Sequence, residues 1–392
     1  MRVLQVLTSF YPAVRAGGTV FAPYALTRAL ARKGIDLVIY TTNLDAGEKL
    51  DVPVDRPVTM GNMRVYYHPV PGNNRYFFSP SLWRRLHREL DRFDLVHLHE
   101  TWTFPILIMA TYCWRRGIPY IISPHGTLDT WCIDWKYLKK KIYFEFLGKS
   151  IYQHASAVHF TSEAERDNLS PTIPFKLNNP VIIPNPLDLD EYQDLPPKGR
   201  FRNEYNIPTD SPIILFVGRL HEKKGLDLLI KTFADLSNQE AMLLIVGPNE
   251  SGYQKKLEVL VRELALGSRV IFTGPLTGMD KLAVYRDSSF LALPSHQENF
   301  GMVVAEAMAA ELPVIISEHV NIAKDVQSAG AGLVLPLEPQ CWTRAMETLL
   351  ESAEGSRNMG LAGRKFALKH YSPSGVADMM LLAYLEIVEG RS

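Results

Sequence analysis

Short apolar runs that end in turn signals recur along this chain, with longer stretches of helical pattern between them. In the first half these runs cover residues 3–9, 36–42, 95–100, 120–126 and 157–162. FAPYALTRALARKG (21–34), which lies between the first two, is apolar on one helical face and is closed by a glycine. Strands that alternate with helices predict an α/β fold with a parallel sheet covered on both faces.

The same pattern then begins again and gives five more runs, at 213–219, 241–247, 269–274, 290–295 and 313–317. Two successive sets predict two doubly wound, Rossmann-like domains, as expected for a chain of 392 residues. We place the first domain at 1–185 and the second at 186–365, with the Pro- and Asp-rich stretch 181–200 as the linker. The helix-like tail at 366–392 is expected to return to the N-terminal domain. Because ligands bind outside the carboxyl ends of parallel strands, two such domains are expected to face one another across a cleft.

Composition narrows the functional class. The chain carries 42 basic and 42 acidic residues, which argues against a general nucleic-acid binder. Residues 1–185 hold 22 Lys/Arg against 15 Asp/Glu and the rest 20 against 27, so the halves carry about +7 and −7. The basic first half could face an anionic membrane or a phosphate-bearing acceptor.

Cysteine usage and hydropathy bear on localisation. The three cysteines, Cys113, Cys132 and Cys341, form no CxxC pair or disulfide framework, which fits a reducing compartment. The amino terminus has too short an apolar run for a signal peptide, and no stretch reaches the ~18 apolar residues of a spanning helix. We therefore expect a soluble, cytoplasmic protein, either free or at the inner face of the membrane.

Two cations stand at the start of the second set. In FVGRLHEKKGLDLLI (216–230), Arg219 follows a predicted strand and Lys224 immediately precedes a glycine and a helical run. Cations beside a helix amino terminus suit a diphosphate, because the helix dipole and free N–H groups attract the anion. A basic surface loop is the competing interpretation. The glycines of a Walker loop are absent.

Two glutamates stand in SHQENFGMVVAEAMA (295–309). Glu298 lies in the loop after a predicted strand, and Glu306 lies in the first turns of a helix expected to begin near Gly301. Both carboxylates could accept hydrogen bonds from vicinal hydroxyls, Glu298 at the strand end and Glu306 where a ribose would lie. The alternatives are a helix-capping residue for Glu298 and a surface position for Glu306, although the apolar flanks at 302–310 make an exposed Glu306 less plausible.

These residues carry a family resemblance. GRLHEKKG (218–225), followed by HQENFGMVVAEAMA (296–309) and ELPVI, resembles the retaining, nucleotide-sugar-dependent glycosyltransferases of family 4 with the GT-B fold. The likeness extends over most of the chain and includes AGGTVF (16–21), SPHGTLD (123–129), TSEAER (161–166) and IPNPLD (183–188).

The resemblance implies a role for each matching residue. It implies that Arg219 and Lys224 bind the donor diphosphate and stabilise the leaving group, and that Glu298 holds sugar hydroxyls and Glu306 the ribose. The remaining implied residues are His125 near the reacting centre, the donor-binding main chain at Asn299, Phe300, Gly301 and Met302, and the loop glycines Gly17 and Gly18.

Some positions leave alternatives open. His125 follows a strand and precedes a glycine, which suits either a structural histidine or a polar contact to the donor sugar. Gly17-Gly18 could be a flexible turn. Pro186 stands after Asn185 where the family commonly has glycine, so the role of Asn185 stays open. Asp188-Leu189-Asp190 resembles a metal motif but lies in the Pro-rich linker, so we expect neither a metal nor another cofactor.

We therefore expect a metal-independent, retaining hexosyltransferase that uses a UDP- or GDP-sugar. The expected acceptor is a sugar or a lipid-linked sugar in cell-surface polysaccharide or glycolipid synthesis, and no nucleic acid. Basic, aromatic-rich stretches at 75–90 and 135–147 could rest on an anionic membrane. The alternatives are a sucrose-phosphate or trehalose synthase-like transferase, a non-catalytic nucleotide-sugar sensor, and a nicotinamide dehydrogenase, for which no G-x-G-x-x-G follows the first strand of either domain.

Overall fold

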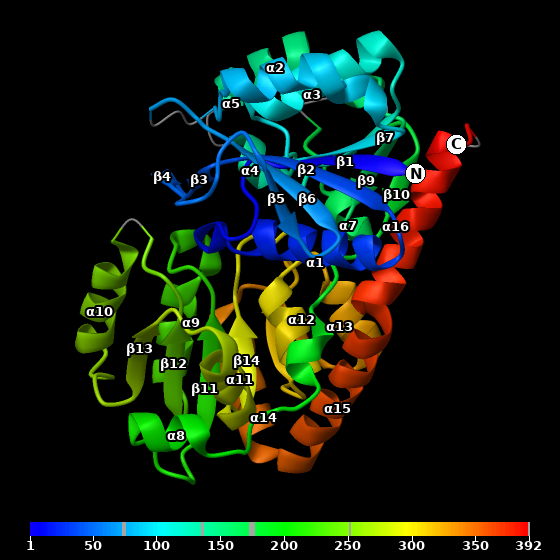
Figure 1. The fold of residues 1–392 in the computed structure, drawn as a ribbon. Helices are drawn as coiled ribbons and strands as arrows, with labels where there is room; N and C mark the ends of the chain where they lie inside the picture. Colours follow the sequence, from blue (N-terminus) through cyan, green and yellow to red (C-terminus); the bar gives the residue numbers. More distant parts are fainter. Residues whose placement is uncertain (73–75, 135–136, 172–176, 251, 391–392) are drawn as a thin grey trace. The chain divides into compact units, whose positions relative to one another are not determined.

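A computed structural model describes residues 1–390 apart from 73–75, 135–136, 172–176 and 251 (Figure 1). The chain divides into two compact units, which we call the N-terminal unit (Met1–Pro186 with Pro373–Ser392) and the C-terminal unit (Leu187–Ser372). The chain passes back into the N-terminal unit at Pro373, a few residues later than the position 366 expected from the sequence, because helix α15 (Ala353–His370) continues through that point.

The N-terminal unit is built on an eight-stranded sheet with the order β10-β9-β8-β7-β1-β2-β6-β5. All neighbouring strands are parallel except β5, which pairs antiparallel with β6. The strands are β1 (Arg2–Val6), β2 (Asp36–Thr42), β5 (Pro57–Met60), β6 (Met63–His68), β7 (Leu95–His99), β8 (Tyr120–Ser123), β9 (Ala157–Phe160) and β10 (Pro180–Ile182); a separate short pair is β3 (Leu44–Asp45) with β4 (Glu48–Lys49). Because β10 belongs to the sheet, the prediction of a linker from residue 181 is wrong at its start.

Helices cover both faces of this sheet. Successive residues of β1 point to opposite faces: Val3 joins the core that includes α1 and α16, and Leu4 joins the core that includes α2 and α3. Figure 1 shows α2 and α3 on one side of the strands and α1 on the other. The helices are α1 (Gly18–Arg32), α2 (Pro80–Glu89), α3 (Phe104–Arg116), α4 (Thr130–Asp134), α5 (Tyr137–Tyr143), α6 (Lys149–Gln153), α7 (Glu163–Asp167) and α16 (Pro373–Val388).

The C-terminal unit contains a six-stranded parallel sheet with the order β13-β12-β11-β14-β15-β16. Its strands are β11 (Ile213–Val217), β12 (Met242–Val246), β13 (Val270–Gly274), β14 (Phe290–Leu293), β15 (Val314–Ser317) and β16 (Gly332–Leu335). Its other helices are α8 (Arg200–Tyr205), α9 (Leu226–Ala234), α10 (Tyr253–Glu263), α11 (Gly278–Asp287), α12 (Met302–Ala309), α13 (Ala323–Ala329) and α14 (Pro339–Glu351).

The strand order places the site in this unit. The chain runs outward from β11 through β12 to β13 on one side, and from β14 through β15 to β16 on the other. The order therefore reverses between the neighbours β11 and β14, and the carboxyl ends of two such strands flank the crevice in which open α/β sheets bind ligands. The loop that follows β11 carries Arg219 and Lys224, and the loop that follows β14 carries Glu298 and leads into α12, which contains Glu306.

Candidate functional site

The loop after β11 is held close to the loop after β14. A short 3-10 turn (Glu222–Lys224) ends at Gly225, which has φ +66° and caps the start of α9. A Cβ at Gly225 would lie 2.1 Å from the carbonyl oxygen of Pro294, and the His296 N–H donates to the Lys223 carbonyl at 2.8 Å. Glycine is required there because a side chain would separate the two loops.

This close approach brings Lys224 and Glu298 together. The Lys224 ammonium forms an ion pair with the Glu298 carboxylate, and their side chains are only 12% and 20% exposed. The main chain of Glu298 is fixed in turn by its N–H, which donates to the His319 carbonyl at 3.1 Å, and by its carbonyl, which accepts from the Asn321 N–H at 3.1 Å. The sequence indicated both residues separately, and the structure makes them partners.

Glu306 is held by two groups from α11. Its Oε2 accepts from the Tyr285 hydroxyl at 2.7 Å and lies 2.6 Å from the Lys281 ammonium. Burial, with the neighbouring Glu306 carboxylate, raises the pKa of Tyr285 well above its ordinary value, so the hydroxyl stays a donor. The Glu306 side chain is only 13% exposed, so the surface alternative raised for it from the sequence does not describe its position.

The segment between the glutamates contributes main chain. Gly301 has φ +81° and caps α12, whose first N–H groups have no partner within the helix. The Phe300 ring is buried against Tyr371, with ring centroids 5.3 Å apart, so only its main chain is available to a ligand. Asn299 lies in the loop just before this cap, and Met302 begins the helix.

Arg219 is placed differently from Lys224. Its side chain is 55% exposed and donates from Nη1 to Glu250 Oε2 at 2.8 Å. Glu250, in the loop after β12, was not identified from the sequence. Neither were Lys281 and Tyr285, whose contacts to Glu306 join two helices and leave no short-range pattern.

The remaining predicted residues lie in the N-terminal unit, near the carboxyl ends of β1 and β8. Gly17 has φ +68° and ψ −136° and precedes α1, which begins at Gly18. A Cβ at Gly17 would meet no atom within 4 Å, so glycine is needed there for its backbone conformation and not for room within this unit.

His125 also adopts a left-handed backbone conformation, with φ +51°. The following residue, Gly126, donates its N–H to the buried Glu165 at 2.6 Å, which fixes the turn. Beneath His125 lies a cluster of buried histidines that sequence reasoning missed, although LVHLHE places His97 and His99 on the same face of one strand.

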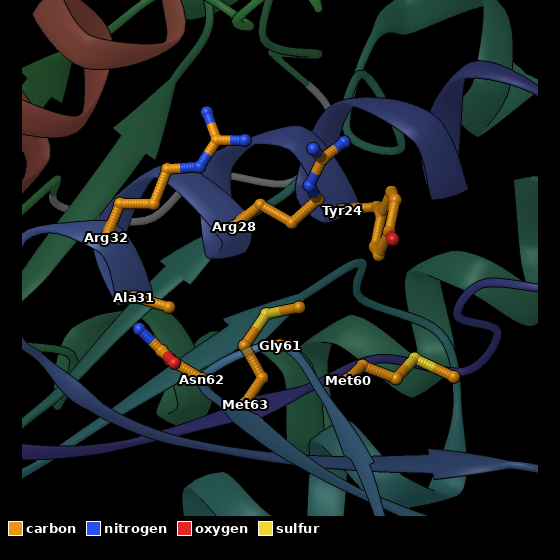
Figure 2. Close-up of a pocket in the computed structure, with 8 residues that line it drawn as sticks. All are labelled: Tyr24, Arg28, Ala31, Arg32, Met60, Gly61, Asn62 and Met63. Carbon is orange, nitrogen blue, oxygen red and sulfur yellow. The ribbon is translucent and has the colours of Figure 1, made fainter.

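A separate pocket of about 370 Å³ lies between α1 and the β5–β6 turn. Figure 2 shows Tyr24, Arg28 and Arg32 reaching from α1, opposite the turn residues 60–63. None of the predicted site residues lines this pocket, so it is distinct from the candidate site.

Comparison with known proteins identifies the family. Residues 16–191 match the family described as Glycosyltransferase Family 4, and residues 197–366 match the one described as Glycosyl transferases group 1. This chain is a family 4 glycosyltransferase with the GT-B fold. The expected family, fold and transferase class are thereby confirmed, and the dehydrogenase alternative is wrong.

Individual relatives of this glycosyltransferase align over most of its length. The D-inositol 3-phosphate glycosyltransferase of Kineococcus radiotolerans is 25% identical over 96% of this chain and 92% of its own. That of Nocardia farcinica is 31% identical over 72% of this chain and 65% of its own.

Solved structures share the fold. The sucrose-phosphate synthase of Thermosynechococcus elongatus superposes with a TM-score of 0.80, at 21% identity and covering all of both chains. Anabaena HepE, solved with UDP and glucose, superposes with a TM-score of 0.77 at 17% identity, over 98% of this chain and all of its own. Among the described helices of this glycosyltransferase, none has the length and apolar character needed to cross a bilayer.

Proposed function

We propose that this glycosyltransferase moves a hexosyl group from a UDP- or GDP-sugar to a sugar or lipid-linked acceptor, with retention of anomeric configuration and without a metal. The observation that carries the proposal is the pair of ion pairs at the switch point of the C-terminal sheet, Lys224 with Glu298 and Lys281 with Glu306. The reaction would serve cell-surface polysaccharide or glycolipid synthesis on the cytoplasmic side of the membrane.

The two ion pairs suit the two ends of a nucleotide sugar. In the proposed complex Lys224 turns to the diphosphate, which leaves the Glu298 carboxylate to accept hydroxyls of the sugar. Glu306, already oriented by two donors, accepts the hydroxyls of the ribose. A donor containing UDP is supported by the likeness to Anabaena HepE, which was solved in complex with UDP and glucose.

In the proposed reaction the cations stabilise the leaving group. Departure of a nucleoside diphosphate builds negative charge on the phosphates, and cations fixed in advance lower the barrier for such a step. The Lys224 side chain is only 12% exposed and that of Arg219 is 55% exposed, so Lys224 carries the larger share. Among the residues that the structure describes, no group of three or more His, Cys, Asp or Glu side chains is arranged to hold a metal.

A phosphorylated soluble acceptor is the second candidate. The Kineococcus and Nocardia relatives are named for D-inositol 3-phosphate, and the Thermosynechococcus neighbour for sucrose phosphate. An acceptor panel of inositol phosphate, hexose phosphates, free sugars and lipid-linked sugars separates the two candidates. Donor binding without turnover on any acceptor would instead support the sensor.

Nucleotide binding tests the donor assignment. Calorimetry of UDP, GDP, ADP and their sugar conjugates, with and without EDTA, should show one preferred base and no effect of EDTA. Glu306→Gln should weaken that nucleotide by about 30-fold, since a hydrogen bond to a charged group contributes about 2 kcal/mol. Glu311→Gln is the matched control, because Glu311 pairs with Arg286 of the same helix α11 at 3.0 Å. Equal effects of the two substitutions would exclude the ribose assignment.

Product stereochemistry tests retention. With the preferred donor and a competent acceptor, proton NMR of the fresh product should show the anomeric configuration of the donor. An inverted product would exclude this part of the proposal.

An exposed apolar surface supports a membrane-bound acceptor. Phe146 is 78% exposed and Leu138 67%, and between them lie the exposed Lys139 and Lys141. Apolar side chains interleaved with cations suit an anionic bilayer surface. The basic stretch at 75–90 contributes less to membrane contact, because Arg85 forms an ion pair with Glu89 at 3.1 Å. Residues 75 and 135–136, also included in that expectation, lie outside the described residues.

Vesicle binding tests this surface. At low salt the protein should co-sediment with phosphatidylglycerol vesicles and not with phosphatidylcholine vesicles. Phe146→Ser with Leu138→Ser should abolish sedimentation, while Leu382→Ser, at a position that is 61% exposed on α16, should not. Sedimentation that survives the double substitution would exclude this surface.

A further inference from the structure

A buried chain of hydrogen bonds runs beneath His125 through the N-terminal unit. Its members come from four neighbouring strands and from the C-terminal helix α16, and each is buried in the core of the unit. They are Gln5 of β1, His97 and His99 of β7, Ser123 of β8, His159 of β9 and Tyr384 of α16.

One arm of the chain begins at a main-chain carbonyl. His159 Nε2 lies 2.8 Å from the Ile183 oxygen, and His159 Nδ1 lies 2.7 Å from the Ser123 hydroxyl. The same hydroxyl lies 2.6 Å from His97 Nε2. This arm therefore connects the segment just after β10 to the middle of the sheet.

The other arm leads from His97 to His125. His97 Nδ1 lies 2.6 Å from the Tyr384 hydroxyl, to which the Gln5 amide nitrogen donates at 2.9 Å. The Gln5 oxygen lies 2.6 Å from His99 Nε2, and His99 Nδ1 lies 2.9 Å from His125 Nε2. The path from Ile183 to His125 is thus unbroken.

The four imidazoles joined by these hydrogen bonds, those of His97, His99, His125 and His159, are neutral at physiological pH. Burial lowers the pKa of His125 to about 3 and that of His159 to about 4, and it lowers those of His97 and His99 well below the ordinary value. A neutral imidazole has one donor and one acceptor nitrogen, so each link fixes the next.

Acidic groups border the chain without interrupting it. Glu100, which follows His99, accepts from the Thr8 hydroxyl at 2.6 Å, and burial raises its pKa. Glu165 accepts from the Gly126 N–H and from both the N–H and the hydroxyl of Thr161. Among the bonds of the chain itself, none uses a carboxylate.

The direction of every proton follows from the Ile183 carbonyl, which can only accept. His159 must donate from Nε2 and accept at Nδ1, so Ser123 donates to it and accepts from His97 Nε2. His97 Nδ1 then accepts from Tyr384, whose oxygen accepts from the Gln5 amide.

The last two hydrogen bonds, from His99 to Gln5 and from His125 to His99, have their donors fixed in the same way. The Gln5 oxygen accepts from His99 Nε2, so His99 Nδ1 accepts from His125 Nε2. His125 is therefore protonated on Nε2 and carries its lone pair on Nδ1. That nitrogen has no hydrogen-bond partner among the residues that the structure describes.

We propose that Tyr384 and Gln5 are positioning residues that hold His125 in the Nε2–H tautomer, so that its Nδ1 accepts a hydrogen bond from a substrate hydroxyl. The inference rests on the proposed function, in which His125 contacts the substrate. It assigns His125 the role of a neutral acceptor, which neither supplies a proton nor bears a positive charge during transfer. It also makes α16 part of the arrangement that orients His125, because Tyr384 of this helix connects the two arms of the hydrogen-bond chain.

Nitrogen NMR of the protein labelled with ¹⁵N-histidine tests the tautomer without substrate. The His125 signals, assigned by their loss in His125→Gln, should show a protonated Nε2 and an unprotonated Nδ1, unchanged between pH 8 and pH 6.5. A protonated Nδ1 in the wild-type protein would overturn the proposal. Because this readout needs no donor, it is independent of whether the proposed reaction is correct.

Tyr384→Phe tests the positioning role against a matched control. It removes a donor to His97 and an acceptor for Gln5, so His125 should become a mixture of tautomers and begin to titrate between pH 8 and pH 6.5. Tyr120→Phe also removes one buried hydroxyl of this unit, which donates to the Ile151 carbonyl at 2.5 Å, but it leaves the chain intact and should leave the His125 signals unchanged. An unchanged His125 spectrum in folded Tyr384→Phe would overturn the proposal.

Turnover completes the test. Tyr384→Phe should lose about tenfold in kcat/KM, the effect of one misdirected hydrogen bond, with a pH dependence between pH 8 and pH 6.5 that is absent from Tyr120→Phe. If Tyr384→Phe does not fold, Ser123→Ala interrupts the other arm and is read in the same way. Correct tautomers in a protein that transfers no sugar would refute the proposed function while leaving the tautomer assignment in place.

Discussion

Acidification should destabilise the N-terminal unit through its histidines. Five histidines of this unit have lowered pKa values because desolvation disfavours their charged forms. The lowered pKa is about 4 for His68 and His159 and about 3 for His125. In the unfolded chain each returns to about 6.5. The unfolded state therefore binds more protons, and stability is complete above pH 6.5 and is lost as the pH falls toward 4.

The size of the loss follows from the same values. One unit below 6.5 each histidine binds about 0.9 proton in the unfolded state and almost none in the folded state, so moving from pH 7.5 to 5.5 costs about 1.3 kcal/mol per histidine. The three histidines with a folded-state pKa of about 3 to 4 together cost about 4 kcal/mol, and His97 and His99 add to the loss in the same direction, so the loss is comparable to the whole stability of many domains. We expect the unit to be marginal or unfolded at pH 5.5.

Urea unfolding followed by tryptophan fluorescence measures this loss, because five of the six tryptophans belong to residues 1–186. His159→Gln should reduce the difference between pH 7.5 and 5.5 by about 1.3 kcal/mol. His87→Gln, at an exposed position on α2, should leave it unchanged. A total loss below about 2 kcal/mol would show that the buried imidazoles accept protons in the folded protein, and the reasoning from burial would fail.

Two further predictions concern the C-terminal unit. Lys224→Ala should lower the transfer rate by about 100-fold or more, because about 3 kcal/mol of stabilisation is lost at the leaving group. Lys256→Ala is the control and should leave the rate unchanged, because it breaks an ion pair whose side chains are 73% and 68% exposed. Similar transfer rates for the two variants in steady-state kinetics would contradict this prediction. Gly225→Ala should cost more than 3 kcal/mol of unfolding free energy, because its Cβ meets the Pro294 carbonyl at a left-handed position. Gly330→Ala, with φ +62° and no atom within 4 Å, should cost only about 1 kcal/mol, and equal losses in urea unfolding would exclude the steric argument.

The ten strands expected from apolar runs are all present, because a strand buried on both faces must be apolar along its length. Two of the strands that the sequence did not predict, β5 and β16, are less buried. In β5, residues 57–60 are exposed or half-buried at the sheet edge, and β16 is half-buried throughout. Both strands are only four residues long, β5 with the sequence PVTM and β16 with GLVL, so the sequence carries only a weak signal for them.

The candidate site divides in a similar way. Lys224 and Glu298 could be found because the ends of parallel strands place loop residues at one edge of a sheet, and Glu306 because its apolar flanks argue against an exposed position. Tyr285, by contrast, reaches Glu306 only through the packing of α11 against α12. Tyr384 reaches Gln5 across 379 positions, and no local pattern predicts such a pair.

The Lys224–Glu298 ion pair leads to a prediction with opposite signs for binding and for turnover. In the structure Glu298 holds Lys224, so a diphosphate has to compete with the carboxylate for the ammonium. Glu298→Gln removes that competition, and UDP or GDP alone should bind about fivefold more tightly, the equivalent of about 1 kcal/mol. The same substitution removes the charged acceptor proposed for the sugar hydroxyls, so the transfer rate should fall by about 100-fold.

Glu250→Gln is the control for the predicted gain in nucleotide affinity and loss of transfer rate. It frees Arg219 from an ion pair in which the arginine side chain is already 55% exposed. An exposed pair contributes little, so nucleotide affinity should change by less than about twofold. Calorimetry with the nucleotide alone decides the matter. If Glu298→Gln weakens the nucleotide as well as slowing transfer, Glu298 helps to orient Lys224 toward the phosphates, and the exchange of partners inferred from the ion pair does not occur.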